Sequence, residues 1–227
     1  ALILRLAAEV YAKGETVPES RADLYQLYLE TAWERAEARG AQDKEKTFAA
    51  LERLAWQLQM GETPDIDEAL LQNCRERMGL VVKVSERLAF SHTTFQEYFV
   101  ALRLKKAWEN NWKWAWQFIR PRLHSARWRE PLLLLAGMLE ECEHQRLVKL
   151  VLNARSPYER PLRRDLKMAA EMIAENQRAA KESSKPVIQR ADRLLKPWYF
   201  RRYKQIEKEK SIKTLGKLGN PQAIEPL

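Results

Sequence analysis

The sequence predicts a mainly α-helical protein with one small β-hairpin. Apolar residues recur at helical spacing through most of the 227 residues, whereas only two short β-prone runs, 79–84 and 88–90, stand side by side. The polar residues 85–87 separate these runs, as the turn of a hairpin would. From Trp108 onward there is no strand signal. We therefore expect a winged-helix domain with a small hairpin, followed by an α-helical solenoid.

The first 108 residues contain the helices expected around the hairpin. Residues 1–40 form two helices at the end of a helical domain, with Gly14 and Pro18 in the turn between them. In the next part, 41–108, one helix ends at Gly61, a short helix occupies 65–78 and the hairpin follows. The helix after the hairpin begins at Thr93 or Thr94. The order helix, helix, wing, helix is typical of a winged-helix domain.

A connecting helical domain is expected over 109–200, and the start of a repeat solenoid over 201–227. Amphipathic patterns cover 132–140, 145–153, 162–175 and 187–195, with turns expected at Pro157, Pro161 and Pro186. Segment 211–227 is similar to a HEAT repeat, because Gly219 can end one helix and Pro221 can begin the next. Three tryptophans one turn apart, Trp108, Trp112 and Trp116, are expected to pack as one stripe.

Charge and cysteine content narrow the functional classes. Residues 1–108 carry 15 Lys+Arg against 17 Asp+Glu, whereas residues 109–227 carry 25 against 14, so the net charge of +9 belongs to the second half. The two cysteines, Cys74 and Cys142, provide neither a disulfide framework nor a zinc site, and buried free thiols are expected. No apolar stretch approaches the roughly 18 residues of a membrane span. We expect a cytoplasmic protein that uses no metal site and no membrane.

The segment 90–101 carries a family resemblance. Its sequence, Phe-Ser-His-Thr-Thr-Phe-Gln-Glu-Tyr-Phe-Val-Ala, resembles the F-S-H-x-T-F-Q-E-Y-F-x-A signature in the winged-helix region of NACHT-type STAND NTPases, the signalling ATPases that include the NOD-like receptors. Segments 2–25 and 128–137 are similar to the flanking helical regions of that family. The resemblance implies a regulatory, sensor-proximal region that holds a nucleotide-bound core closed and couples ligand sensing by the repeats to its opening, in defence signalling.

The sequence contains no G-x-x-x-x-G-K-[ST] loop and only seven glycines, so it offers no cradle for a triphosphate. The chain is therefore interpreted as an internal, non-enzymatic fragment without a cofactor of its own. By the resemblance, the parent protein uses ATP or ADP with Mg²⁺, and an upstream NTPase core acts on this region in cis. The repeats would sense a protein or nucleic-acid ligand, and the protein would oligomerise on activation.

His92 is the principal candidate site residue. The resemblance implies that it reaches the β-phosphate of ADP in the full-length protein and so stabilises the inactive arrangement. Donation from a histidine at a helix N-terminus to a phosphate is chemically reasonable. The alternative is a histidine that caps the helix or is buried at the junction between strand and helix.

The rival function is nucleic-acid binding through the basic C-terminal half. The densest basic stretch spans 196–213 and is interleaved with aromatic residues, which suits phosphate backbones. Its candidate contacts, to nucleic acid or to an acidic protein partner, are Arg201, Arg202, Lys204, Lys208 and Lys210. By contrast, the expected recognition helix at 65–78 carries four acidic residues against Arg75 and Arg77, a poor surface for a DNA groove.

Overall fold

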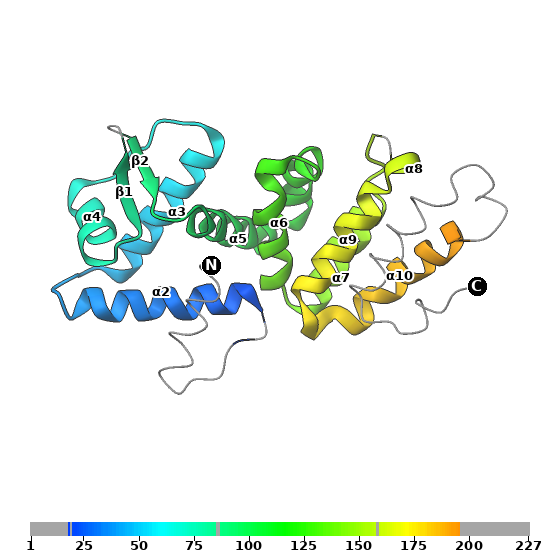
Figure 1. Ribbon diagram of the computed structural model, residues 1–227, viewed down its shortest axis with the longest axis horizontal. Helices are drawn as coiled ribbons and strands as arrows, with labels where there is room; N and C mark the ends of the chain where they lie inside the picture. Colours follow the sequence, from blue (N-terminus) through cyan, green and yellow to red (C-terminus); the bar gives the residue numbers. More distant parts are fainter. Residues whose placement is uncertain (1–17, 19, 85–86, 158, 196–227) are drawn as a thin grey trace. The chain divides into compact units, whose positions relative to one another are not determined.

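The computed structural model describes residues 18, 20–84, 87–157 and 159–195 (Figure 1). Over these residues the protein is mainly helical, with a single antiparallel hairpin, as the sequence predicts. The chain divides into two compact units, Ala1–Trp116 and Gln117–Leu227, and the boundary falls inside one long helix. The expected division into four parts, the winged-helix arrangement and the solenoid stay predictions.

The described part of the first unit begins with two long helices, whereas the helix expected before Gly14 lies outside the described residues. Helix α2 (Arg21–Glu37) starts where the Ser20 hydroxyl accepts a hydrogen bond from the amide N–H of Asp23, at 3.0 Å. Such a cap satisfies one of the amides that have no partner within the helix. Helix α3 (Lys44–Met60) ends at Gly61, whose φ of 78° is the left-handed geometry that closes helices. Both glycine stops expected from the sequence, Gly40 and Gly61, have positive φ.

The short helix before the hairpin differs from the expected 65–78. Asp67 accepts hydrogen bonds from the amides of Ala69 and Leu70, so helix α4 (Glu68–Gln72) begins three residues late. It continues as a π-helical turn, η1 (Asn73–Arg77). Strands β1 (Val81–Val84) and β2 (Arg87–Phe90) then pair in the register Val81 with Phe90 and Val84 with Arg87. The predicted hairpin is confirmed.

Helix α5 (Thr93–Ile119) follows the hairpin directly and supplies the core of the first unit. Phe95, Tyr98 and Phe99 are buried, whereas Leu102 is only half-buried. Burial raises the pKa of the Tyr98 hydroxyl above its ordinary value of 10, because the anionic form would lose its hydration.

The expected tryptophan stripe is wrong, because α5 is broken at Asn111. This residue has non-helical dihedrals (φ −156°, ψ 88°), and its side-chain oxygen accepts a hydrogen bond from the amide of Trp114 at 3.2 Å. This hydrogen bond starts a new helical segment. Side chains after Asn111 therefore do not continue the faces of the segment before it. Trp108 is therefore buried while Trp112 is half-buried, and the fourth tryptophan of the cluster, Trp114, is 55% exposed.

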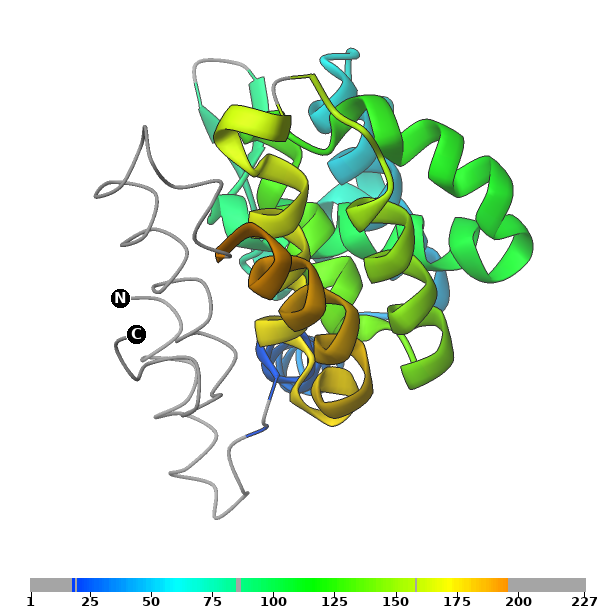
Figure 2. The ribbon, with the colours of Figure 1, turned by 90° about the vertical axis from the view of Figure 1, so that its right-hand side faces the viewer.

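The second unit continues with short helices. These are η2 (Arg120–Arg122), α6 (Ala126–Met138), α7 (Glu141–Leu152), α8 (Glu159–Leu162), α9 (Arg164–Glu175) and α10 (Gln177–Leu195). Helix α9 packs against α6, α7 and α10. Figure 2 shows α7, α9 and α10 side by side. Their apolar faces enclose a core that includes Leu135, Leu147, Val151, Ala169 and Met172.

Three expectations for this unit are wrong. Pro161, expected in a turn, lies inside α8. Pro186 lies inside α10 instead of in a turn before a helix at 187, and α10 begins ten residues earlier, at Gln177. Buried Ala179 and Val187 place the first half of this longer helix against the core, and that packing offsets the hydrogen bond that a proline removes. Of the two thiols expected to be buried, Cys74 is buried and Cys142 is exposed.

Candidate functional site

His92 lies in the two-residue junction between β2 and α5. Its backbone is fixed on both sides, because the amide of Ser91 donates to the carbonyl of Leu80 at 2.8 Å and the amide of Phe95 donates to the carbonyl of His92 at 3.0 Å. The side chain itself is exposed. Among the described residues, no hydrogen bond or ion pair of its imidazole ring is found.

Aromatic packing beneath the junction fixes the position of His92. Phe95 stacks on Tyr28 with ring centroids 5.3 Å apart, and Phe99 contacts Phe90 of β2 at 5.9 Å. Phe99 is fully buried, so rotation of α5 about its axis would expose a large apolar side chain. The first turn of α5 and the residue before it are therefore held in one orientation.

The alternative of a buried histidine at this junction is wrong, because the ring is exposed. An exposed imidazole is able to donate a hydrogen bond to an anion. A helix N-terminus favours such an anion through its first amide groups and its dipole. The phosphate-sensing role of His92 stays a prediction.

The arginines of segment 65–78, the segment expected to be unsuited to DNA, make contacts with neighbouring residues of the same segment. Arg75 forms an ion pair with Glu76 at 2.9 Å, and Arg77 donates to the side chain of Asn73. Hydrogen bonds from Gln72 and then from Arg75 lower the pKa of the Glu76 carboxyl. Both arginines are thus engaged locally, and the helix that would enter a groove has only five α-helical residues before the π turn. These features oppose groove recognition by this segment.

The remaining sequence predictions concern the basic segment, metal sites and membrane spans. The basic contacts Arg201, Arg202, Lys204, Lys208 and Lys210 lie outside the described residues. Within the described ranges, no group of three or more His, Cys, Asp or Glu side chains is placed to hold a metal ion. In the same part of the chain, no helix is long and apolar enough to cross a membrane.

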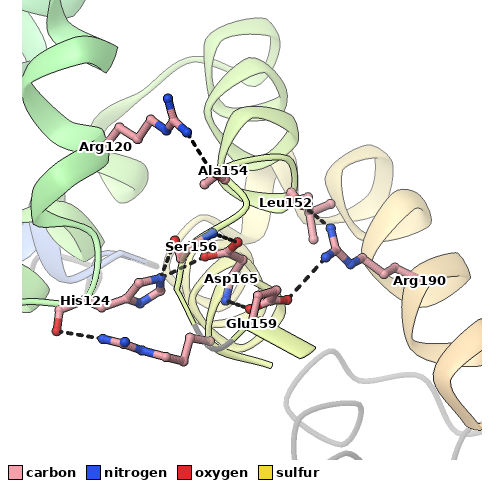
Figure 3. Close-up of polar contacts among 9 residues, drawn as sticks. Arg120, His124, Leu152, Ala154, Ser156, Glu159, Asp165 and Arg190 are labelled. Carbon is pink, nitrogen blue, oxygen red and sulfur yellow. Dashed lines mark hydrogen bonds and ion pairs between the residues drawn. The ribbon is translucent and has the colours of Figure 1, made fainter. Parts of the chain in front are cut away.

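A buried polar network in the second unit was not expected from the sequence (Figure 3). At its centre, Nε2 of His124 lies 2.8 Å from Oδ1 of Asp165 and 3.0 Å from Oγ of Ser156. Asp165 is fully buried, and its second oxygen accepts the backbone N–H of Ser156 at 3.0 Å. The three residues come from the η2–α6 loop, the α7–α8 loop and the start of α9.

Further ion pairs extend the network to α10. The side chain of Glu159 accepts the backbone N–H of Asp165 at 2.7 Å and pairs with Arg190 at 3.3 Å. Arg190 also donates to the carbonyl of Leu152. The segment held in this way begins and ends with left-handed residues, since Arg155 has φ 54° and Arg163 has φ 52°. Such geometry costs about 1–3 kcal/mol at each non-glycine residue, and the buried hydrogen bonds offset it.

The geometry of His124, Ser156 and Asp165 is unsuited to activation of a serine nucleophile. A catalytic histidine receives the serine proton on one ring nitrogen while the carboxylate orients the other. Here both partners approach the same atom, Nε2, which must carry its hydrogen to donate to the carboxylate. Ser156 and Asp165 therefore share one N–H group, and the arrangement stabilises the loop instead.

The third histidine, His144, is buried and hydrogen-bonded on both ring nitrogens. Nε2 lies 3.2 Å from the carbonyl of Met172, so it donates, and Nδ1 then accepts from the Ser183 hydroxyl at 2.8 Å. Burial lowers the pKa of His144 below its ordinary 6.5, with a smaller opposing effect from the Met172 carbonyl. His144 therefore connects α7, α9 and α10 as a neutral side chain.

Comparison of the chain with protein-family profiles, with curated proteins and with solved structures finds no match. The functional argument therefore depends on the residues and geometry described above.

Proposed function

We propose that this chain is the regulatory and sensor-proximal region of a NACHT-like STAND signalling ATPase. In this function, His92 binds the β-phosphate of ADP and holds a nucleotide-bound core closed. The observation that carries the proposal is the exposed imidazole at the start of α5, on a junction fixed by buried aromatic residues and without a partner among the described residues. The F-S-H-x-T-F-Q-E-Y-F-x-A pattern at 90–101 supports it.

The free energy of one hydrogen bond between His92 and a phosphate is large enough to control an equilibrium between a closed and an open state. A hydrogen bond to a charged phosphate contributes about 1.5–3 kcal/mol, which changes a closed-to-open equilibrium by about 10- to 150-fold. That contribution is present only in the closed state, when the phosphate is within reach of His92. A ligand that favours the open state by a similar free energy would therefore release the core.

Several components complete the proposed mechanism. A phosphate-loop ATPase core, acting in cis in the cytoplasm, supplies the nucleotide site and Mg²⁺. The helices of the second unit connect that core to repeats that sense a protein or nucleic-acid ligand, and opening permits oligomerisation. In this proposal the region itself performs no hydrolysis, which agrees with the lack of a G-x-x-x-x-G-K-[ST] loop in its sequence.

The test measures ADP release from the protein that contains this region together with its ATPase core. His92→Ala should accelerate release of a fluorescent ADP analogue about tenfold or more, as expected for the loss of a charge-assisted hydrogen bond. His92→Gln, which retains an N–H donor, should recover part of the effect. The surface control Lys83→Ala, on the neighbouring strand β1, should release ADP at the parent rate. An unchanged release rate in His92→Ala would exclude the proposed phosphate contact.

A further inference from the structure

A cavity of about 300 Å³ lies in the second unit, between the start of α6 and one face of α9. Its volume is at the lower end of the range for small-molecule sites. The apolar part of the wall includes Leu123, Ala126 and Met168. The polar part consists of His124, Ser125, Arg129, Arg164, Lys167 and Glu171. The cavity therefore combines apolar surface with a group of charged side chains.

The charges that line the cavity are predominantly positive. Three cationic side chains face one carboxylate, that of Glu171. Arg129 is compensated, because it pairs with Glu171 at 3.1 Å and with Glu130 at 2.6 Å. Arg164 and Lys167 form no ion pair with any described carboxylate. Two cations of the lining therefore remain available to an anion.

The buried network holds one of these cations in place. Arg164 uses one guanidinium nitrogen to donate to the carbonyl of His124 at 3.4 Å, which leaves most of its donors available. The neighbouring Asp165 forms no ion pair with Arg164, and both oxygens of Asp165 accept hydrogen bonds within the network. Since His124 and Asp165 are fixed to each other, the two sides of the cavity are fixed as well. Such preorganisation reduces the cost of binding.

The start of α6 adds a weaker attraction for anions. Ser125 and Ala126 line the cavity at the point where the helix begins, and the Ser125 side chain makes no capping hydrogen bond. First-turn amides of a helix lack partners within the helix and favour negative charge. This effect acts in the same direction as Arg164 and Lys167.

We propose that this cavity binds the phosphate group of a small phosphorylated molecule. A phosphate monoester is nearly dianionic at neutral pH, and its charge matches the two uncompensated cations. Lys167 and Arg164 contact the phosphate oxygens, and Ala126, the exposed apolar residue of the lining, adjoins the organic part. This site is separate from His92 and its proposed nucleotide contact, so either can fail without the other.

The experiment titrates the 227-residue chain with ribose 5-phosphate, inorganic phosphate and ribose, using calorimetry at low ionic strength. We expect saturable binding of both phosphate compounds, with ribose 5-phosphate tighter, and no binding of ribose. Lys167→Gln should raise the dissociation constant about fivefold or more through loss of one charge-assisted hydrogen bond. The matched control is Lys149→Gln, an exposed lysine on α7 outside the cavity. It should change the dissociation constant less than about twofold.

Three results would overturn the proposal. The first is the absence of saturable binding by either phosphate compound up to about 20 mM, a concentration that corresponds to negligible affinity. The second is an equal loss of affinity in the Lys149 and Lys167 variants, which would indicate general charge attraction. The third is displacement of phosphate by a short DNA duplex at lower concentration than by ribose 5-phosphate, which would assign the surface to nucleic acid. Arg164→Gln provides a second cavity variant, and equal melting temperatures of all variants establish that folding is intact.

Discussion

His124 and Asp165 are 41 positions apart in the chain, yet Nε2 of the first lies 2.8 Å from a carboxylate oxygen of the second, whose side chain is fully buried. An ionised carboxylate in that position is tolerated only because every oxygen has a donor. The contact therefore connects the α5–α6 junction to the start of α9, and its loss would leave one oxygen of a buried carboxylate without its donor.

Asp165→Ala should lower the free energy of unfolding by about 3 kcal/mol, because it leaves His124 and the amide of Ser156 without their acceptor. Urea denaturation measures this change. Ser156→Ala is the matched control: it removes one neutral hydrogen bond and should cost about 1 kcal/mol. A double-mutant cycle of Asp165→Ala with His124→Ala should give a coupling energy of about 1–3 kcal/mol, whereas additive effects would contradict the contact.

The pH dependence of stability should contain a contribution from His144. The pKa of His144 is lower in the folded state than in the unfolded chain. At a pH between the folded-state pKa and the ordinary pKa of 6.5, the unfolded chain therefore binds more protons than the folded one. The free energy of unfolding should therefore fall as the pH decreases below about 6.5, by at most about 1.4 kcal/mol per pH unit for one group. Denaturation of the parent and of His144→Gln across this range provides the measurement. Parallel curves would show that His144 is not responsible.

Phe99→Ala should cost about 3–5 kcal/mol, because it removes a fully buried aromatic side chain from the centre of the first unit. Leu102→Ala, one turn further along α5, should cost less than about half as much, since Leu102 is only half-buried. Thermal and chemical denaturation of the two variants tests the register of the helix that carries His92. Equal destabilisation by both substitutions would indicate a rotated α5.

Any nucleic-acid affinity should reside in segment 196–213 and not in the segment around η1. Binding by that basic segment would release counterions and would therefore weaken by orders of magnitude between about 50 and 200 mM salt. The comparison is a triple charge reversal, Arg201→Glu, Arg202→Glu and Lys204→Glu, against the pair Arg75→Glu and Arg77→Glu in filter binding. Loss of affinity in the second variant alone would reveal a groove reader and contradict this expectation.

The sequence predicts local structure well where local signals dominate. The hairpin and the start of α5 follow from two β-prone runs, a polar turn and a threonine before a helical pattern, and the structure has them at the expected positions. Prediction failed where tertiary packing or a single side-chain bond decides. Asn111 interrupts a helical pattern by capping its own next turn, and Pro186 lies inside a helix in which Ala179 and Val187 are buried.

One candidate site could be predicted from the sequence, whereas the other two depend on tertiary packing. His92 could be singled out from its motif, and its exposure agrees with a contact outside the described residues. The network of His124, Ser156 and Asp165 has no signature in the sequence, because its members come from three separate connections and only the folded chain brings them together. The cavity at Lys167 likewise depends on the packing of α6 against α9.

The two cysteines make the chain its own reporter of folding. The buried thiol of Cys74 has a pKa raised to about 12, so at neutral pH it is almost entirely the unreactive protonated form, whereas Cys142 is accessible to reagents. A maleimide dye would therefore attach at α7 alone while the protein is native. Reaction of Cys74 with the dye over time would then measure how often the first unit opens, and no engineered residue is needed.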